Sequence, residues 1–535
     1  MNSIRYYFLA TLVCFSLSIQ AEANTLKGTT ISQWELLDIT FNEVVKSDNP
    51  FVVDFGAMFI HENGDTIKAP GFYNGDNDWV VRFSSSQLGS WRYTTFGPKP
   101  LSGKKGKITV NANSDKTKHG AVTLSEDDPQ HFYYEDGTPY YLLAFECDWL
   151  FALDYHNESN LPKSKHLLNL LKENGINQIV MNVFSYNVSW PKDEKLQDHP
   201  EHEFGGSPDI FPFLGNNDQP DFTSLNVDFF KKLDRTIALM AEYNMDAHLM
   251  IYVWNKLVSW PDMYSDADNM YFDYVVKRYQ AYHNVIFDIS KEALFYGRAD
   301  EAYILERIER VRSLDQFGRL LSVHDFGFCK RNPDKVDFIS TQNWSWDIYN
   351  KMLEAGREFK NKPIFNIEHG GYEESPYTVF PGAYTDPEVC LRRNYACVFA
   401  GAYSTYYWQA AAWNVIIYNP FEQHESFVKP KFSYYKHLAN FFREHPYVNY
   451  EPSPWRNGSS YSMKDKEGNF IFYVHKDNYK MPTYWLSQHK DKTVSTQWFN
   501  TLTGEYTKAQ VIDKNAEQIS PWRGEADAIL LIDLE

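Results

Sequence analysis

The sequence is poor in cysteine. Its 535 residues include 5 Cys, and Cys14 falls in the leader segment described below. The others, Cys147, Cys329, Cys390 and Cys397, contain no CxxC pair, which disfavours both a zinc site and a disulfide scaffold. Cys390 and Cys397 are spaced two turns apart on a predicted helix, too far to bond. The sequence therefore predicts four buried thiols.

Acidic residues outnumber basic ones, and the usual cofactor motifs are missing. The formal net charge is −18, and no basic stripe marks a nucleic-acid surface, so nucleic acid is not an expected partner. The sequence has no nucleophilic-serine elbow, no HExxH zinc motif and no EF-hand loop, and no glycine-rich phosphate loop follows its first predicted barrel strand. No metal or other cofactor is expected.

Long apolar runs are absent except at the N-terminus. Residues 1–23 combine Arg5, an apolar run over residues 6–19 and the small-residue pattern Ala21-Glu22-Ala23. The run is shorter than the roughly 20 residues of a membrane span, so we expect a cleaved secretory signal, with an uncleaved anchor as the alternative. The mature chain is expected to be secreted or periplasmic, without membrane contact. The sequence does not indicate its oligomeric state.

Aromatic residues are abundant, at 17% of the chain. They favour either aromatic-lined β-sandwich cores or sugar binding, since the apolar face of a sugar ring packs on an aromatic ring. Alternating patterns and turn signals over residues 24–120 predict an N-terminal β-sandwich. Short strands return over residues 446–535 and predict a C-terminal β-sandwich, with strands expected at 469–475, 483–486, 495–499 and 528–532.

Between these regions, strands alternate with amphipathic helices. Eight apolar strand candidates cover residues 140–145, 178–184, 246–253, 285–289, 320–324, 338–342, 363–367 and 404–408. The helix after the first candidate is expected to begin at a Ser164 cap, bury Leu167, Leu170 and Leu171, and stop at Gly175. Eight such units in series predict an α/β fold with a (β/α)8 TIM barrel over residues 121–445, flanked by the two sandwiches. A long segment from about 185 to 222 is expected to stand over the active face.

Several acids follow the predicted strands directly, where a barrel carries its catalytic groups. Glu146 and Asp148 follow the first strand, Glu292 the fourth, Asp325 the fifth and Glu368 the seventh. Hydrolysis of a glycosidic bond needs two carboxyl groups, about 5–5.5 Å apart in a retaining enzyme. An acid at the end of an apolar buried strand contributes little to apolar packing. Glu292 as acid/base and Glu368 as nucleophile are therefore the predicted catalytic pair.

Three segments resemble the apiosidase-like barrel hydrolases. They are the run from His283 to Glu292, the run from Lys362 to Gly371, and the helical segment from Tyr274 to Tyr279. The resemblance places Glu292 on the acid and Glu368 on the nucleophile of that family. Both flanking regions also resemble its accessory sandwiches, the C-terminal one being of a type described as collagen- or sugar-binding. The resemblance thus implies a secreted glycoside hydrolase acting on a plant or algal polysaccharide or its oligosaccharides.

One position departs from the family pattern. The family commonly has Asn immediately before the acid, where it holds the 2-hydroxyl of the sugar, and this chain has Lys291. A cation there lowers the pKa of a neighbouring acid unless burial compensates. Three interpretations stay open: Lys291 meets an anionic substituent such as a uronate or sulfate, it pairs with a nearby acid such as Asp288, or the activity has shifted.

Further residues at strand ends are predicted to bind substrate. Trp149, Trp344 and Trp408 are candidate stacking platforms, although core packing explains a single Trp nearly as well. Trp254 is a fourth such tryptophan. The candidates for hydrogen bonds to sugar hydroxyls are Asp148, His324, Asp325 and Gln342, with Lys291 beside the acid.

Two other functions remain as alternatives. A non-catalytic carbohydrate-binding protein on a barrel scaffold would keep its binding when both glutamates are changed. A polysaccharide lyase would need a base such as Tyr186 or Lys291 beside a uronate, and it would leave the paired acids without a role.

Overall fold

The structure is a computed structural model. It describes residues 28–157, 160–184, 210–254, 258–369, 386–408, 416–423, 425, 429–454, 460–478, 481–489, 491–515, 518–519 and 522–535. The predicted signal over residues 1–23 lies outside these ranges. The chain separates into two compact units, residues 1–112 and 113–535. Within the described residues, no helix combines the length and the apolar character needed to cross a membrane.

The first unit is built from two sheets, as the alternating pattern predicts. One has the order β1 (Thr29–Ser32), β8 (Lys105–Asn111), β7 (Gly89–Phe96), β3 (Gly56–His61), β4 (Thr66–Pro70), and the other the order β2 (Leu37–Asn42), β6 (Asp78–Phe83), β5 (Phe72–Tyr73). Phe59 from one sheet stacks on Phe83 from the other at 4.4 Å between ring centroids. Trp91 meets Phe83 edge-on at 5.3 Å. Inward-facing aromatic rings therefore form the core of this sandwich.

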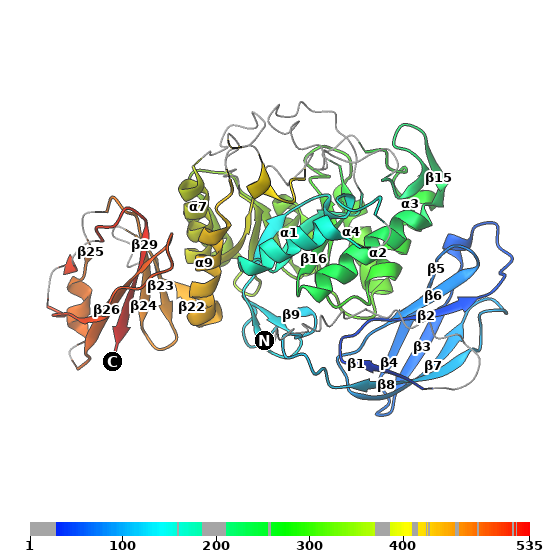
Figure 1. Cartoon of the computed structure of the whole chain (residues 1–535), viewed down its shortest axis with the longest axis horizontal. Coiled ribbons are helices and arrows are strands. Elements are labelled where there is room, and N and C mark those ends of the chain that lie inside the picture. The colour runs from blue at the N-terminus through cyan, green and yellow to red at the C-terminus, as the bar shows by residue number, and fades with distance from the viewer. Residues whose placement is uncertain are drawn as a thin grey trace, which may run out of the picture. The chain divides into compact units, whose positions relative to one another are not determined.

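The second unit contains a ring of parallel strands, of which β16 is labelled in Figure 1. Its eight-stranded sheet confirms the barrel prediction. In sheet order the strands are β18 (Leu321–His324), β17 (Val285–Lys291), β16 (Asp246–Val253), β13 (Gln178–Asn182), β12 (Leu143–Glu146), β21 (Ala402–Tyr406), β20 (Ile364–Glu368) and β19 (Ile339–Gln342). Polar contacts connect the ends of this order, since Asp337 N donates to Leu321 O at 2.8 Å and Ser322 Oγ to Phe338 O at 2.9 Å.

Helices connect these strands and lie outside the ring (Figure 1). They are α1 (Pro162–Glu173), α2 (Val227–Glu242), α3 (Asp266–Tyr279), α4 (Glu301–Leu314), α5 (Phe326–Arg331), α6 (Ile348–Glu358), α7 (Pro387–Phe399) and α9 (Phe432–Glu444). Of the long segment expected after the second strand, residues 185–209 lie outside the described ranges. Its end forms a hairpin of β14 (Phe213–Gly215) and β15 (Pro220–Leu225). All four cysteines beyond the leader are buried free thiols, as predicted.

A polar cluster occupies the barrel interior. His248 Nε2 lies 2.9 Å from Asp288 Oδ2, and Gln178 Nε2 lies 3.4 Å from His248 Nδ1. The His248 ring also packs near Phe338 and Phe365. Alternate residues of these strands therefore point inward, and positions sharing the face of Gln178, His248 or Asp288 line the interior.

The C-terminal region is a six-stranded sheet in the order β22 (Tyr450–Pro452), β23 (Tyr461–Asp465), β24 (Phe470–Val474), β29 (Ala528–Leu534), β26 (Val494–Asn500), β27 (Gln510–Val511), with a two-stranded sheet of β25 (Met481–Pro482) and β28 (Gln518–Ile519). Three expected strands are present, but the strand expected at 483–486 is wrong. Those residues belong to a 3-10 turn, Tyr484–Gln488. In it the consecutive residues Trp485 and Leu486 both face the core, which the alternating sides of a strand would not allow.

Helix α1 differs from its prediction at its start. It begins at Pro162, and its first turn is capped by Asp154, whose carboxylate accepts hydrogen bonds from Ser164 N at 2.7 Å and Lys163 N at 3.3 Å. Ser164 is thus inside the helix, and Leu168 rather than Leu170 completes the buried face. Asp154, which lies outside the helix, therefore caps α1 in place of the predicted Ser164. The predicted stop is confirmed, because Gly175 has φ +83° and Ile176 N donates to Leu171 O at 3.2 Å.

The stop of α1 provides a stability test. A Cβ added at Gly175 would meet Ala439 Cβ of α9 at 2.4 Å and would also sit at positive φ. We expect Gly175→Ala to lower the free energy of unfolding by about 2–4 kcal/mol, measured by urea denaturation. Gly318→Ala is the matched control, since Gly318 has φ +68° and nothing within 4 Å of an added Cβ. Gly318→Ala should lower the free energy of unfolding only by the cost of a positive φ, about 1 kcal/mol. Equal losses would contradict the contact with Ala439.

Candidate active site

One buried lysine joins two carboxylates at the mouth of the barrel. Lys291 Nζ lies 2.7 Å from Glu146 Oε1 and 2.9 Å from Glu368 Oε2. Lys291 is 1% exposed, Glu146 0% and Glu368 3%. Each residue ends its strand, β17, β12 and β20 respectively. Lys291 therefore pairs with acids, but with Glu146 and Glu368 rather than with Asp288, whose partner is His248.

Two strand irregularities aim these side chains. On β17, Asp288 pairs with Ser322 and Lys291 with His324, so one extra residue is inserted against β18. Such a bulge reverses the alternation of sides, which puts Lys291 on the inward face of Asp288. Asp288 Oδ1 holds the irregular segment by accepting hydrogen bonds from Ser290 N and His324 N, both at 3.0 Å.

The second irregularity lies between β19 and β20. Thr341 pairs with Asn366 and Gln342 with Glu368, again with one extra residue. Gln342 Nε2 consequently donates to Glu368 Oε1 at 3.0 Å. Both oxygens of Glu368 thus face a donor, an amide on one side and an ammonium on the other.

Glu292 follows Lys291 directly but has a different environment. Its φ of +58° is rare for a non-glycine residue, and backbone strain of this kind collects at functional sites. Its backbone N donates to His324 O at 3.3 Å. The side chain is partly exposed, and Oε2 is buried without a hydrogen-bond partner among the described residues. Glu292 therefore has an unused acceptor.

Burial and charge set the protonation of this cluster. Burial raises the pKa of both Glu146 and Glu368, and the Lys291 ammonium opposes this rise in each case. The charge of Glu292 further raises the pKa of Glu368. Burial would lower the pKa of Lys291, but Glu146 and Glu368 outweigh it, so its pKa lies well above the usual value and the lysine stays charged.

Two further predicted residues adjoin Glu368. His324 Nε2 lies 4.0 Å from Glu368 Oε2, and burial together with the Lys291 charge lowers the pKa of His324 well below its usual value. His324 is therefore neutral at pH 7. Asp148 is fully buried beside Glu146, and its charge raises the pKa of Glu146, Lys291 and Glu368. The structure thus brings Asp148, Lys291, His324 and Gln342 together around Glu368.

Comparison with known proteins assigns this barrel to a family. A family model described as the catalytic domain of apiosidase-like proteins matches residues 126–449, which is more than half of the chain. The chain belongs to the apiosidase-like family. It is accordingly a glycoside hydrolase, and its resemblance to that family is confirmed. A second model, described as a domain of unknown function (DUF5060), matches residues 30–97. No curated protein matches the sequence significantly.

Solved structures share the fold of this apiosidase-like protein. A Bacteroides vulgatus ATCC 8482 protein, itself assigned only provisionally as a glycoside hydrolase, has a TM-score of 0.75 at 18% identity, over 95% of this chain and 100% of that one. A family 5 glycoside hydrolase from the same organism has a TM-score of 0.53 at 14% identity, over 77% and 92% of the two chains. Another glycoside hydrolase has a TM-score of 0.54 at 16% identity, over 77% and 97%.

The remaining predicted binding residues have local structural partners. Asp325 caps α5 by accepting a hydrogen bond from Phe328 N at 2.8 Å. Trp149 and Trp408 are fully buried, and Trp344 is partly buried near Tyr407. Their roles in substrate binding stay predictions, and Tyr186 lies outside the described residues. Within the described part of the chain, no group of three His, Cys, Asp or Glu side chains is arranged to hold a metal ion.

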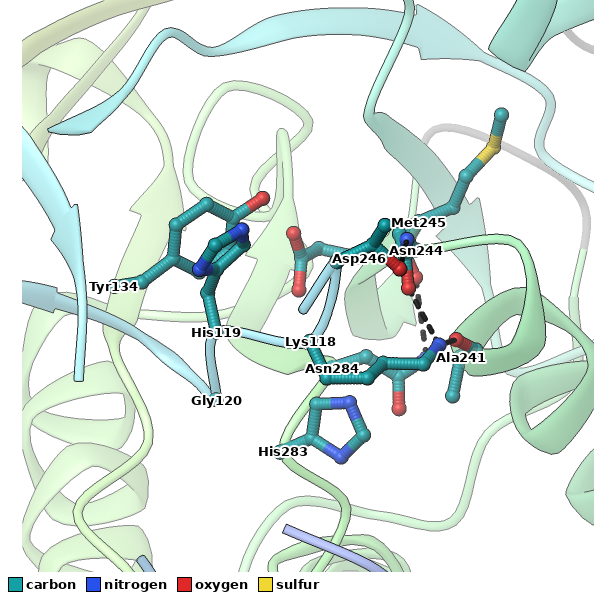
Figure 2. Close-up of a pocket in the computed structure, with 11 residues that line it drawn as sticks. Lys118, His119, Gly120, Tyr134, Ala241, Asn244, Met245, Asp246, His283 and Asn284 are labelled. Atoms are coloured by element: carbon teal, nitrogen blue, oxygen red, sulfur yellow. Dashed lines mark hydrogen bonds between the residues drawn. The ribbon is translucent and has the colours of Figure 1, made fainter. Parts of the chain in front are cut away.

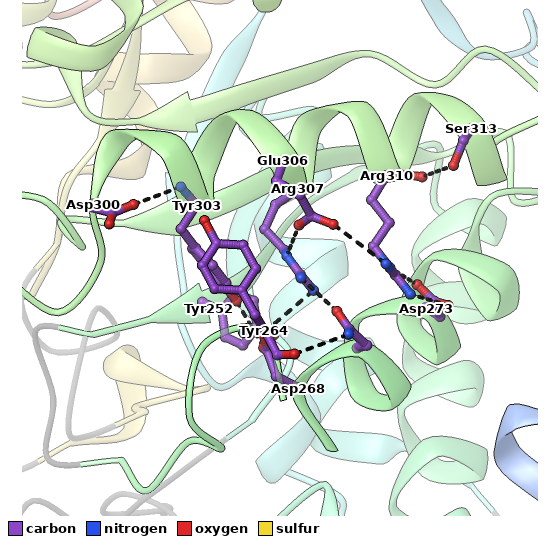
Figure 3. Close-up of polar contacts among 11 residues, drawn as sticks. Tyr252, Tyr264, Asp268, Asp273, Asp300, Tyr303, Glu306, Arg307, Arg310 and Ser313 are labelled. Atoms are coloured by element: carbon purple, nitrogen blue, oxygen red, sulfur yellow. Dashed lines mark hydrogen bonds and ion pairs between the residues drawn. The ribbon is translucent and has the colours of Figure 1, made fainter. Parts of the chain in front are cut away.

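A polar network anchors the segments after β16 and β17 (Figure 3). The hydroxyls of Tyr252 and Tyr303 both donate to Asp268, the latter at 2.8 Å, and Tyr264 N donates to the same carboxylate at 2.9 Å. Arg307 adds an ion pair to Asp268 at 3.6 Å. Trp254 stacks on Tyr252 at 4.5 Å and is buried. Buried hydrogen bonds therefore hold the segments that follow β16 and β17 in the apiosidase-like barrel.

The sequence analysis missed several residues on this face. Phe295, Tyr296 and Trp346 follow β17 and β19, and Phe295 and Trp346 are 80% and 88% exposed. These exposed rings are available for contact with a ligand. Asn182, the last residue of β13, is fully buried. Aromatic residues within seven positions after the predicted strand ends at 289 and 342 were a signal for the first three, whereas nothing in the sequence distinguished Asn182.

A polar pocket lies at the end of the strands opposite to Glu368 (Figure 2). Its lining includes Lys118, Tyr134 and Asp246, and Asp246 is the first residue of β16. Lys118 Nζ donates to Ala241 O at 2.5 Å and to Asn244 Oδ1. Burial raises the pKa of Asp246 to about 7. Because barrel enzymes carry their catalytic groups at the carboxyl ends of the strands, this pocket belongs to the stabilising end of the apiosidase-like barrel.

Proposed function

We propose that the protein is a retaining glycoside hydrolase in which Glu368 is the nucleophile and Glu292 the acid/base. The observation that carries this proposal is the difference between the two carboxyl groups. Glu368 faces an ammonium at 2.9 Å and an amide donor at 3.0 Å, which favour its ionised form. Glu292 keeps a buried oxygen that has no hydrogen-bond partner among the described residues. Two carboxyl groups in unlike environments can take the two roles of this chemistry.

The proposed reaction has two steps. In the first, an oxygen of Glu368 bonds to the anomeric carbon while the bond to the leaving oxygen breaks, and Glu292 gives that oxygen its proton. In the second, Glu292 takes a proton from water, the water oxygen bonds to the anomeric carbon, and Glu368 leaves as a carboxylate. Two displacements restore the original configuration of the sugar.

The proposed substrate is a plant or algal polysaccharide or an oligosaccharide derived from it. Lys291 bears on whether that glycan is anionic, because a lysine beside the acid suggests a uronate or sulfate partner. Its ammonium is 1% exposed and already paired with two carboxylates. This pairing supports a neutral sugar at this position. The exposed rings of Phe295 and Trp346 support binding of further sugar units.

The contacts of Lys291 with Glu146 and Glu368 also argue against a polysaccharide lyase. A lyase base must accept a proton from the substrate, but Glu146 and Glu368 raise the pKa of Lys291 and keep it protonated. A retaining hydrolase uses both strand-end glutamates, whereas a lyase uses neither. Variants of Glu292 and Glu368 test the binding-only alternative, because a protein that only binds carbohydrate has no activity for them to remove.

Activity should depend on both glutamates. A panel of neutral and anionic polysaccharides would identify the substrate, and NMR of the first product should show retained configuration. We expect Glu368→Gln and Glu292→Gln each to lower kcat by about 10³-fold or more while substrate still binds. Glu358→Gln is the control, because Glu358 is exposed and forms a surface ion pair with the exposed Lys330. An inverted product, or full activity in Glu368→Gln, would refute the proposed mechanism.

We also propose that the protein is exported, on the basis of the signal pattern in residues 1–23. The mature chain should begin at Asn24. Mass spectrometry of protein from the culture medium or periplasm would check this, and a chain retained in the cell with its leader intact would contradict it.

A further inference from the structure

Glu146 is a third carboxyl group for which the two-acid mechanism has no role. It is fully buried and ends β12, the strand beside β13 and β21. Its contact with Lys291 is the shorter of the two that the ammonium makes, 2.7 Å against 2.9 Å to Glu368. A buried carboxylate and a buried ammonium are each costly to desolvate, so a pair in this position needs a reason beyond stability.

The proposed catalytic cycle supplies a reason for this buried ion pair. In the proposed first step the carboxylate of Glu368 becomes a neutral ester. A buried lysine that had only Glu368 as its partner would then be left uncompensated, which costs several kcal/mol. With Glu146 in contact, Lys291 keeps a counter-ion while the charge of Glu368 is consumed and restored.

We propose that Glu146 is a positioning residue that fixes the Lys291 ammonium against Glu368 and remains its counter-ion in the glycosyl-enzyme. The proposal rests on the assignment of Glu368 as nucleophile. Fixed in this way, the ammonium stabilises Glu368 as a leaving carboxylate in the second step. Among the described residues, Glu292, Asp148, His324 and Tyr296 are further titratable groups near Glu368, and burial keeps His324 neutral.

A titration tests the charge coupling without any substrate. The protein would be labelled with carbon-13 at the glutamate side-chain carboxyl carbons, and Glu368→Gln would assign the Glu368 signal. Lys291→Met should raise the titration midpoint of Glu368 by about 1–3 units, because it removes the cation. Glu146→Gln should lower it by about 1 unit, because Lys291 then pairs with Glu368 alone. A purely structural role for the pair would not move the midpoint in opposite directions.

Controls separate this coupling from misfolding. Lys118→Met removes a half-buried lysine at the other end of the barrel and should leave the midpoint unchanged. If Lys291→Met fails to fold because Glu146 is left unpaired, the double variant Glu146→Gln with Lys291→Met removes that unpaired carboxylate and should show the raised midpoint. An unmoved midpoint in that double variant, or a raised one in Glu146→Gln, would overturn the proposal.

Kinetics test the role during the cycle. The probe is the 2-deoxy-2-fluoro glycosyl fluoride of the sugar that the polysaccharide panel identifies, and the readout is the rate of covalent labelling by mass spectrometry. Glu146→Gln should slow labelling about 10–100-fold, and adding Lys291→Met should recover part of that loss, since no buried cation then lacks a partner. A double variant slower than Glu146→Gln would overturn the counter-ion role. Failure of Glu368 to label at all would instead refute the proposed function.

Asn182 carries a second inference independently. Neither its side-chain N nor its O has a hydrogen-bond partner among the described residues, although the residue is fully buried. It lies four residues after Gln178 on the inward face of β13. Its backbone N donates to Asp148 O at 2.8 Å, one pleat beyond Glu146 toward the mouth. An unsatisfied buried amide is destabilising, so a ligand that satisfies it is the natural explanation.

We infer that Asn182 binds a hydroxyl group of the sugar held above Glu146 and Lys291. A hydroxyl both donates and accepts, and a primary amide offers one group for each. The residue is thus a specificity determinant for that sugar, and this role also rests on the proposed function.

Asn182→Leu separates binding from structure. It should lower kcat/KM about 10–100-fold while raising the thermal midpoint, because it removes an unsatisfied buried amide. Among monodeoxy analogues of the substrate, one should react equally well with the variant and the parent protein. A lowered thermal midpoint, or losses of equal size for every analogue, would mean that the amide only holds water in the fold and would overturn the inference. The thermal readout needs no substrate, so it stands apart from the proposed function.

Discussion

The site depends on one ammonium shared by two carboxylates inside a ring of strands. Lys291, Glu146 and Glu368 end three different strands, and the contacts at 2.7 and 2.9 Å connect them across the barrel mouth. In a poorly solvated interior such charges are tolerated only with good geometry. Two bulges, each beside one of these strand ends, provide that geometry. The requirement to keep the lysine paired therefore constrains the strand ends on which the catalytic proposal rests.

Much of the fold could be predicted because buried parallel strands have a simple signature. Each is a short apolar run, and the acid that breaks the run marks its carboxyl end, as with Ile364–Glu368. The misses came where a distant residue decided the local structure. Asp154 caps α1 from outside the helix, and a core that needs both Trp485 and Leu486 selects a turn over a strand. No local pattern contains those partners.

The site was harder to predict than the fold, for a geometric reason. In a regular strand, successive side chains point to opposite faces, so sequence position predicts the face. An extra residue in a bulge reverses this prediction for every residue that follows it. Lys291 lies three residues after Asp288, so simple alternation turns it away from the interior where it is found. The acids could be recognised as strand ends, whereas the pairing of Lys291 with Glu146, 145 residues earlier, follows only from the closed ring.

The lysine also changes how substrate recognition must work. The apiosidase-like resemblance implies an amide before the acid, and an amide can bond a sugar hydroxyl directly. An ammonium held between Glu146 and Glu368 has little capacity left for that hydroxyl, since both contacts are shorter than 3 Å. Recognition then falls to neutral groups nearby, and Asn182 has both of its side-chain polar atoms unused among the described residues. In the proposed mechanism, the charge that serves the nucleophile thus shifts hydroxyl recognition from β17 to Asn182 on β13, two strands away.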